Sequence, residues 1–264
     1  MGCGGSSGDA ATSSSGATTG AGGSATASGS GGGDGGQGGG AVGSSGSSGT
    51  GGAPAACKAL FCEDFEGGKD IDPVKWKVDV GYDPGNMLAL QSTQVAHGTS
   101  AAHAHLVDTT GGFATLREST TFPQLADELW GRAYFYTTVA DGAGHTGFIS
   151  AFVADARVLE IGQSNGNWQL TYYEPGKEYP AGYNTKIPQS KWVCLEWHFK
   201  RSGPKLIEVY TDGALAVDYD ASGHQPAALT AVSLGIDNHS ANPPGNDVYL
   251  DDIAVDAARI GCLP

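Results

Sequence analysis

The chain contains 264 residues, of which 28 are Asp or Glu and 14 are Lys or Arg, so its formal net charge is −14 at pH 7. A protein that grips the phosphates of nucleic acid needs a basic surface, so this balance excludes nucleic acid as a partner. No apolar run approaches the ~18 residues of a membrane-spanning helix, which leaves the N-terminus as the only route to a membrane.

The first part of the chain differs sharply from the rest. Residues 1–52 consist almost entirely of Gly, Ser, Ala and Thr and contain no Lys, Arg or aromatic residue. Such a segment buries too little apolar surface to offset the entropy of ordering it, so we predict a disordered tether. Residues 53–264 contain regularly spaced aromatic and β-branched residues and are numerous enough for one sizeable core. We therefore predict a single domain at 53–264.

Cys3 lies in the opening "MGCGGSSG", which allows three interpretations. The stretch fits the signature for myristoylation of Gly2, with Cys3 available for palmitoylation at the cytosolic face. Cys3 can also be incidental in a disordered segment. Thirdly, it resembles the lipidated cysteine of bacterial lipoproteins, which follows a Gly and precedes a flexible Gly/Ser spacer. We favour lipidation of this third kind as the only membrane attachment, and expect an apolar signal segment to be encoded upstream of Met1.

The domain shows the pattern of β-strands separated by turns. Short segments alternate between apolar and polar residues, with Gly, Pro and Asn between them, and none has a sustained 3.6-residue apolar period. Asp212-Gly213, between two such segments, is a strong hairpin signal. We therefore predict an all-β sandwich. The expected strands lie at 59–66, 100–108, 112–119, 129–139, 145–154, 157–163, 167–174, 191–200, 205–220 (two strands), 231–237 and 247–256.

Four cysteines lie in the predicted domain: Cys57, Cys62, Cys194 and Cys262. Their spacing lacks the paired short gaps of a zinc ribbon, so we favour disulfides, which imply an oxidising compartment. Four cysteines allow three pairings. Cys57 precedes the first expected strand and Cys262 follows the last, and those two strands are neighbours in many antiparallel sandwiches. We therefore predict the pairs Cys57–Cys262 and Cys62–Cys194.

Several stretches resemble one protein family. "LFCEDFEGGKDIDPVKW" at 60–76 and "VYLDDIAV" at 248–255 frame the domain as concanavalin A-like jelly rolls are framed. Between them, "IGQSNGNW" (161–168), "SKWVCLEWHFK" (190–200) and "IEVYTDG" (207–213) occur in the order seen in one branch. Over residues 57–264 the chain resembles this branch, which contains fungal cellulose-induced proteins and glucuronan lyases. The resemblance implies a jelly-roll sandwich, but this fold serves lectins, glycosidases, lyases and adhesion modules alike.

Acidic residues gather on the first and last expected strands, in "DFE" (64–66) and "DD" (251–252). If the two strands pair, these carboxylates would repel one another and raise each other's pKa unless a cation such as calcium compensates them. The family resemblance implies a structural calcium ion held by Glu66, Ser100 and Asp252. The alternative is that the acids are solvated charges at strand ends.

The family resemblance also implies a catalytic strand. The lyases carry a His-x-Arg-x-x-x-Gln pattern, whose basic groups neutralise a uronate carboxylate and assist removal of the C5 proton. Alignment on "GQ" places the Gln at Gln163, but Arg157 then occupies the His position and Leu159 the Arg position. An acidic residue further along corresponds to Glu174. His145, at the start of an expected strand, is a candidate general base.

Aromatic residues crowd the Gly-, Pro- and Asn-rich stretch at 167–183. Exposed rings bind the C–H faces of sugars, whereas plain core packing is the alternative. Alternation places Trp168 and Tyr173 on opposite faces of one strand, and one of these faces is expected to be core. The candidate substrate-binding residues are Tyr173, Tyr179, Tyr183 and Trp168.

His103 and His105 lie two residues apart on an expected strand and so share a face, which is a spacing found in metal sites. No third His or Cys lies nearby in the sequence, so we expect a structural or solvent-facing pair.

Together these features predict a monomeric extracellular jelly-roll domain, lipid-anchored or secreted, that binds or processes a β-linked polysaccharide, uronic-acid polymers included. The alternatives are an active lyase that performs β-elimination, and a laminin-G-like adhesion module that binds protein. The Glu-x-Asp-x-Glu strand of laminarinase-type jelly rolls is missing, which argues against a retaining glycosidase. Calcium is the one expected cofactor.

Overall fold

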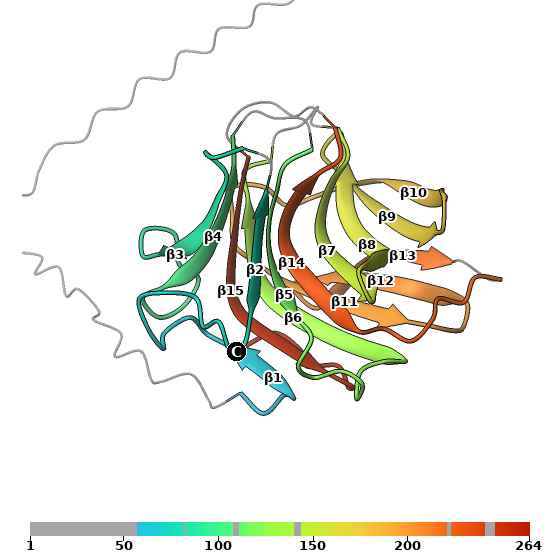
Figure 1. Cartoon of the computed structure of the whole chain (residues 1–264), viewed down its shortest axis with the longest axis horizontal. Helices are drawn as coiled ribbons and strands as arrows, with labels where there is room; N and C mark the ends of the chain where they lie inside the picture. Colours follow the sequence, from blue (N-terminus) through green and yellow to red (C-terminus); the bar gives the residue numbers. More distant parts are fainter. Residues whose placement is uncertain (1–56, 82, 108–110, 140–143, 221–222, 241–245) are drawn as a thin grey trace, which may run out of the picture. The chain divides into compact units, whose positions relative to one another are not determined.

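The described residues form a sandwich of two antiparallel β-sheets (Figure 1). The computed structural model describes residues 57–264 except 82, 108–110, 140–143, 221–222 and 241–245. Cys3 and the tether predicted at 1–52 lie outside the described residues, so both stay predictions. No helix occurs among the described residues, and the predicted jelly-roll fold is confirmed.

The eight-stranded sheet has the order β13-β12-β11-β6-β15-β4-β3, and β1 pairs with the second half of β15. The pairing predicted between the first and last strands is therefore correct. Figure 1 shows β1 beside the C-terminus. The strands are β1 (Phe61–Glu63), β3 (Met87–Gln91), β4 (Ala101–Leu106), β6 (Glu128–Thr137), β11 (Val193–Lys200), β12 (Lys205–Thr211), β13 (Ala214–Asp220) and β15 (Asn246–Asp256).

The seven-stranded sheet has the order β10-β9-β8-β7-β14-β5-β2. Its central strands β8 and β14 consist of residues that alternate between the core and the outer face, as the sequence pattern predicts. The strands are β2 (Lys77–Gly81), β5 (Phe113–Glu118), β7 (Thr146–Val153), β8 (Ala156–Ser164), β9 (Asn167–Glu174), β10 (Lys177–Lys186) and β14 (Ala231–Asn238).

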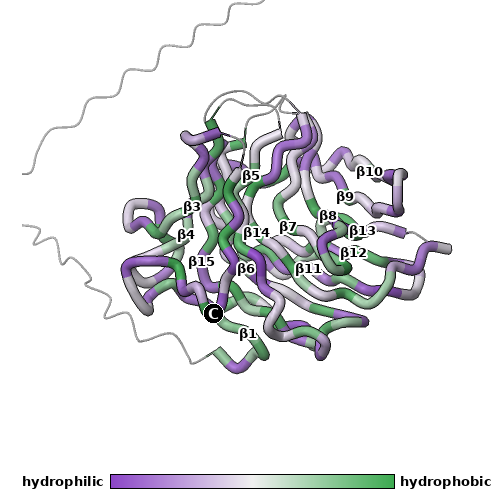
Figure 2. The backbone as a smooth tube through the Cα atoms, viewed as in Figure 1, coloured by the Kyte–Doolittle hydropathy of each residue, from purple (hydrophilic) through white to green (hydrophobic). Residues whose placement is uncertain are grey.

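The core lies between the two sheets, and Figure 2 shows hydrophobic residues concentrated along the central strands. Its largest side chains include Trp168 and Trp197, which are almost fully buried. Gly131 on β6 lies directly opposite Trp197 on β11. A Cβ atom at Gly131 would lie 2.0 Å from the indole ring, so only glycine leaves room for Trp197 here.

The Asp212-Gly213 hairpin joins β12 and β13 as predicted. Both residues have positive φ angles, 49° and 81°, as the favoured two-residue hairpin turn requires. Asp212 also binds the neighbouring strand. Its Oδ1 accepts a hydrogen bond from Cys194 N at 2.9 Å, and its own N donates to Cys194 O at 2.8 Å.

Two disulfides form, as predicted, but the predicted pairing is wrong. The bonds are Cys57–Cys62 and Cys194–Cys262. Cys62 lies opposite Ala254 of β15, which lies opposite Arg132 of β6. Cys194 is on β11, beyond β6, so three strand spacings of about 4.8 Å each separate it from β1. A disulfide needs Cα atoms within about 7 Å, so Cys62 and Cys194 cannot pair.

The C-terminal segment 257–264 makes the second disulfide possible. It runs over the outer face of β6 and β11, where Arg132 Nη1 donates to Gly261 O at 3.2 Å and Tyr134 Oη donates to Leu263 O at 3.3 Å. Cys262 thereby reaches Cys194, and Cys57 pairs locally instead.

Disulfides persist in oxidising compartments, so the two bonds indicate a secreted or extracellular protein. Among the residues that the structure describes, no helix has the length and apolarity that crossing a bilayer requires.

Candidate functional site

A buried carboxylate on the outer face of the seven-stranded sheet organises the candidate site. On β8, Leu159 and Ile161 are core residues, so alternation turns Glu160 away from the core. Glu160 nevertheless has 0% of its surface exposed. Other polar side chains cover it. A buried carboxylate loses its contacts with water, so these side chains must supply hydrogen bonds or opposite charge in their place.

Four side chains from separate elements converge on the two oxygens of Glu160. Oε1 lies 2.7 Å from Nε2 of His145, which precedes β7, and 3.0 Å from the hydroxyl of Tyr173 on β9. Oε2 lies 3.0 Å from Nε2 of His239, which follows β14, and 2.6 Å from Nη1 of Arg157. We call these five residues the Glu160 cluster.

Arg157 is itself tightly held. Its Nη2 donates to the carboxylate of Asp237 on β14, and its Nη1 lies 2.7 Å from His239 Nε2. Its guanidinium therefore compensates two carboxylates, Glu160 and Asp237. The imidazoles of His145 and His239 lie against each other, with ring centroids 4.5 Å apart.

The contacts of the Glu160 cluster set its protonation states. Burial alone would raise the pKa of Glu160, but hydrogen bonds from His145 and His239 and the charge of Arg157 hold it well below its usual range. Burial alone would lower the pKa of His239, but its interactions with Glu160 raise it. Burial and the charge of Glu160 raise the pKa of Tyr173 far above its usual range. The cluster therefore holds an ionised acid, a readily protonated imidazole and a tyrosine that keeps its proton.

Two glycines keep the strands beside Glu160 free of side chains. Gly147 on β7 and Gly162 on β8 lie directly opposite each other. A Cβ at Gly147 would lie 2.5 Å from the Glu160 carboxylate, so glycine is required there.

A cavity of about 480 Å³ adjoins the Glu160 cluster. Arg157 and Tyr173 line it together with Glu174 and with residues 225–227. This volume lies within the range of small-molecule sites, and the mixture of apolar lining with a few fixed polar groups is typical of such sites.

The Glu160 cluster is suited to acid–base chemistry rather than to metal binding. His145, Glu160 and His239 offer ligand atoms within 4.8 Å of one another, which is close enough for a metal ion. The Arg157 guanidinium, however, already lies 2.6 Å from Glu160 and would repel a cation. Imidazoles oriented by a carboxylate are the usual general bases and acids of enzymes.

Of the four predicted catalytic residues, His145 and Arg157 join the Glu160 cluster, and Gln163 does not. Gln163 is 1% exposed. Its Nε2 donates to Gly144 O at 2.8 Å and its Oε1 accepts from Gly166 N at 2.7 Å, so its amide holds the β8–β9 turn. Because both ends of its amide are bound to the backbone, Gln163 has no group directed toward the Glu160 cluster.

Glu174, the fourth, lies at the end of β9 beside the same cavity. Its carboxylate accepts hydrogen bonds from the hydroxyls of Tyr179 at 2.8 Å and Tyr172 at 3.3 Å, and lies 3.2 Å from His224 Nδ1. Glu174 therefore forms a second polar group that is separate from the Glu160 cluster.

Only one of the predicted sugar-binding aromatic residues lies on the outer face. Trp168 is 1% exposed and belongs to the core. Tyr179 and Tyr183 pack against the core from β10, and the Tyr183 hydroxyl donates to Asp218 O at 2.5 Å. Tyr173 is the residue that reaches the Glu160 cluster.

The three residues predicted to hold calcium meet at one loop. Glu66 Oε1 accepts hydrogen bonds from the backbone N of Thr99 at 2.8 Å and of Ser100 at 2.9 Å. Asp252 Oδ2 lies 2.5 Å from His97 Nδ1 in the same loop. Burial, together with the charge of Asp252, raises the pKa of Asp251 to about 7. Glu66 and Asp252 thus contact the same loop, and calcium at these residues stays a prediction.

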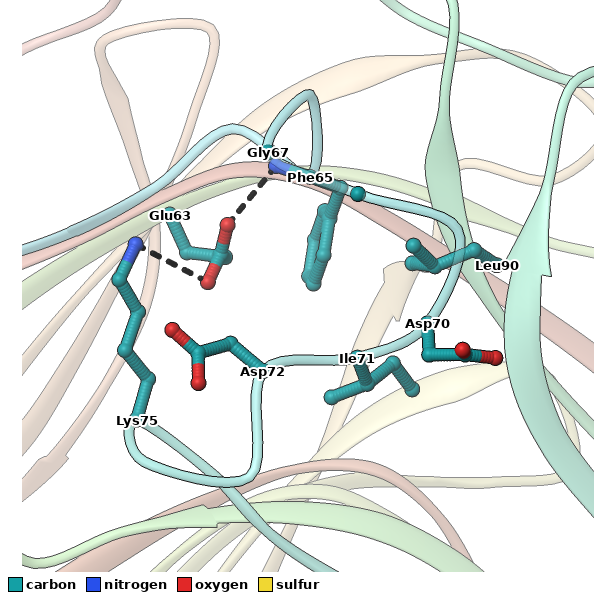
Figure 3. A pocket seen from close by; sticks show the side chains of 9 residues that line it. Glu63, Phe65, Gly67, Asp70, Ile71, Asp72, Lys75 and Leu90 are labelled. Atoms are coloured by element: carbon teal, nitrogen blue, oxygen red, sulfur yellow. Dashed lines mark hydrogen bonds and ion pairs between the residues drawn. The ribbon is translucent and has the colours of Figure 1, made fainter.

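A further cavity, of about 240 Å³, lies in the loop between β1 and β2 (Figure 3). Figure 3 shows Glu63 facing Lys75, whose Nζ lies 3.2 Å from the Glu63 carboxylate. The same carboxylate accepts hydrogen bonds from Phe65 N at 2.9 Å and Trp76 Nε1 at 3.2 Å. Glu63 thus holds this loop in place through one ion pair and two hydrogen bonds.

Sequence reasoning missed Glu160, His239 and Asp237. The available signal for Glu160 was an acid in the middle of the otherwise apolar strand "VLEIG". Asp237 lies near the end of β14 and His239 directly follows it, and this strand lies next to β7 only in the folded sheet, so no local pattern links them to Glu160.

Comparisons with known proteins establish the fold. No protein-family model matches the chain, and no curated protein matches it. The structure is similar to that of the cellulose-induced protein Cip1, with a TM-score of 0.61, 20% identity, and coverage of 76% of this chain and 99% of that one. It is also similar to an endo-beta-1,4-glucuronan lyase from the fungus Trichoderma reesei, with a TM-score of 0.58, 12% identity, and coverage of 76% and 96%. At these identities the likeness shows a shared jelly-roll fold.

Proposed function

We propose that the domain is a polysaccharide lyase that cleaves a β-linked, uronic-acid-containing polysaccharide at the Glu160 cluster. The observation that carries this proposal is the convergence of His145, His239 and Tyr173 on one buried carboxylate. A domain that only binds sugar has no need to bury an ionised acid and orient two imidazoles with it, because that burial is costly. The structural neighbours support the substrate class, since one of them is a glucuronan lyase.

In this proposal His145 is the general base. Its Nε2–H donates to Glu160, which leaves the Nδ1 lone pair available, and Nδ1 makes no hydrogen bond within the described residues. Nδ1 removes the C5 proton of the uronate. The electrons of the C5–H bond form a C4=C5 double bond while the C4–O bond to the leaving sugar breaks.

Tyr173 is the proposed general acid. Its raised pKa keeps the hydroxyl protonated, and only a strongly basic oxygen, such as the departing alkoxide, would take that proton. His145 and Tyr173 both contact Glu160 Oε1, at 2.7 and 3.0 Å. After the product leaves, the imidazolium releases its Nδ1 proton to solvent and the tyrosinate takes a proton from solvent, while Glu160 keeps both side chains in place.

His239 and Arg157 supply positive charge to the uronate. His239 has a raised pKa and a side chain that is 30% exposed, so its imidazolium can meet a substrate carboxylate. Arg157 Nε is buried and has no hydrogen-bond partner among the described residues. Arg157 therefore acts on the uronate through its charge and not through a direct bond from Nε, and such neutralisation lowers the cost of forming charge next to C5.

Ultraviolet absorbance of the unsaturated product tests the proposal. We expect product from glucuronan or alginate with the wild-type chain, and a rate about 10²- to 10⁴-fold lower with His145→Ala or Tyr173→Phe. Tyr183→Phe is the matched control. The Tyr183 hydroxyl donates to the backbone oxygen of Asp218 on β13, away from the Glu160 cluster, so we expect this variant to retain the wild-type rate.

Binding of the same polymers, measured by affinity electrophoresis, separates the alternatives. Binding without product would replace the lyase by a carbohydrate-binding domain. Neither binding nor product, on these polymers and on a glycan array, would favour a protein-binding adhesion module and overturn the proposal.

A further inference from the structure

A second cluster of histidines and a carboxylate lies on the opposite side of the sandwich, on the outer face of the eight-stranded sheet. His103 and His105 are on β4, and Asp247 is on the neighbouring strand β15. The register places Asp247 directly opposite His105 and Tyr249 directly opposite His103. The sheet therefore supplies the third metal-ligand residue that the sequence near the two histidines lacks.

The side chains of the three residues converge on one point. Asp247 Oδ1 lies 2.7 Å from His103 Nε2 and 2.8 Å from His105 Nδ1. All three ligand atoms lie within 4.8 Å of one another. The side chains are 16%, 28% and 21% exposed in the order His103, His105, Asp247, so solvent ions can reach them.

Neighbouring residues fix the orientation of this cluster. The His103 ring stacks on the Tyr249 ring, with centroids 4.3 Å apart and planes 5° apart. Thr138 Oγ1 donates to Asp247 Oδ2 at 3.2 Å, which holds the other carboxylate oxygen. Such supporting contacts orient the ligands in protein metal sites.

We propose that His103, His105 and Asp247 bind a divalent transition-metal ion of the zinc type. Two imidazole nitrogens and one carboxylate oxygen are the donors that such ions prefer, whereas calcium and magnesium select all-oxygen sites. Three protein ligands leave a coordination position open to water or to a ligand.

The required geometry is close to the observed one. In a tetrahedral zinc site with bonds of about 2.1 Å, neighbouring ligand atoms lie about 3.4 Å apart. The observed separations of 2.7 and 2.8 Å need to widen by about 0.6 to 0.7 Å, which small rotations of the partly buried rings provide.

Its charge environment distinguishes this cluster from the Glu160 cluster. Glu160 has the Arg157 guanidinium at 2.6 Å, which occupies the place of a cation. Among the described residues, no Lys or Arg bonds to Asp247, and its partners are the two histidines and Thr138. The negative charge of Asp247 is thus left for protons or for a metal ion to compensate.

Zinc titration of the full chain by isothermal calorimetry at neutral pH tests the site. We expect one zinc ion to bind to the wild-type chain, and His103→Gln and Asp247→Asn to weaken binding roughly tenfold or more. His224→Gln is the matched control, since His224 lies on the surface beside one carboxylate and outside any three-ligand group of the described residues. Thermal melting without zinc checks that each variant folds, and His105→Gln replaces any variant that does not.

Electron paramagnetic resonance with Cu²⁺ gives a second measurement. We expect nitrogen coupling from imidazole in the wild-type spectrum and its reduction in His103→Gln. Unchanged zinc affinity in both ligand variants would overturn the proposal. So would loss of zinc binding in His145→Gln with retention in His103→Gln, because the metal would then belong to the Glu160 cluster.

Discussion

At the scale of single residues, the buried carboxylate of Glu160 holds several strands and side chains in fixed positions. It lies on the solvent side of a sheet, yet four polar groups cover both of its oxygens. Three of these groups come from other parts of the chain, and the fourth, Arg157, lies three residues before Glu160 on β8. The carboxylate therefore fixes the relative positions of β7, β8, β9 and β14 on this face, and it orients the two imidazoles that we propose to be reactive.

This arrangement predicts how stability depends on pH. The folded pKa of His239 is raised above its ordinary value of 6.5, so its contribution is fully present below that pH and is lost as pH rises through the folded pKa. The folded pKa of Glu160 is lowered below 4.5, so its contribution is present above that value and is lost as pH falls through the folded pKa.

We expect the free energy of unfolding in urea to decline above about pH 6.5, and His239→Gln to abolish this decline. His224→Gln should leave it intact, because His224 contacts Glu174 instead. An identical pH profile in wild type and His239→Gln would contradict the assignment.

At the scale of elements, the C-terminal segment 257–264 crosses the outer face of the eight-stranded sheet and is bound to it at several points. Arg259 pairs with Glu196 on β11 at 2.8 Å, and Gly261 N donates to the same carboxylate at 3.0 Å. The Cys194–Cys262 bond then closes a loop between residues 68 apart, whereas Cys57–Cys62 joins residues 5 apart. The two bonds should therefore differ in their effect on stability.

In the chain-entropy model the long loop stabilises the fold by about 4 kcal/mol and the short one by about 2 kcal/mol. We expect Cys194→Ala/Cys262→Ala to lower the free energy of unfolding by about twice as much as Cys57→Ala/Cys62→Ala. Urea denaturation of both double variants measures this difference. An equal loss, or a larger one for the short loop, would show that strain or residual structure in the unfolded chain outweighs loop entropy.

At the scale of the whole domain, the two outer faces of the sandwich carry different chemistry. The seven-stranded sheet presents the Glu160 cluster, and the eight-stranded sheet presents His103, His105 and Asp247. The N-terminal and C-terminal strands of the domain also contact one shared loop, at residues 96–100. Glu66, just after β1, and Asp252, on β15, both bind residues of this loop.

We propose that calcium binds at this junction and stabilises the domain. Millimolar calcium should raise Tm by several degrees in the wild-type chain, because an ion that binds only the folded state shifts the equilibrium toward folding. Asp252→Asn should abolish the shift, and asparagine suits the positive φ of 45° at this position. Asp70→Asn, at an exposed acid, is the control that should keep the shift. No shift in the wild-type chain would leave these acids as ordinary strand-end charges.

The sequence predicted the central strands correctly and missed three strands, β2, β3 and β10. All three lie at sheet edges. An edge strand pairs on one side only and is partly exposed, so the contrast between its inward and outward residues is weaker than in a central strand. β10 also contains Pro180 and Gly182, which read as turn residues in isolation.

The chain by itself determined the all-β class, the Asp212-Gly213 hairpin and the presence of two disulfides, because alternation, turn chemistry and cysteine number are local properties. Only the tertiary structure decided which cysteines pair, that Gln163 and Trp168 lie inside, and that Glu160 meets His239 and Asp247 meets His103. These outcomes depend on strand order and register, which are set by packing between residues far apart in the sequence.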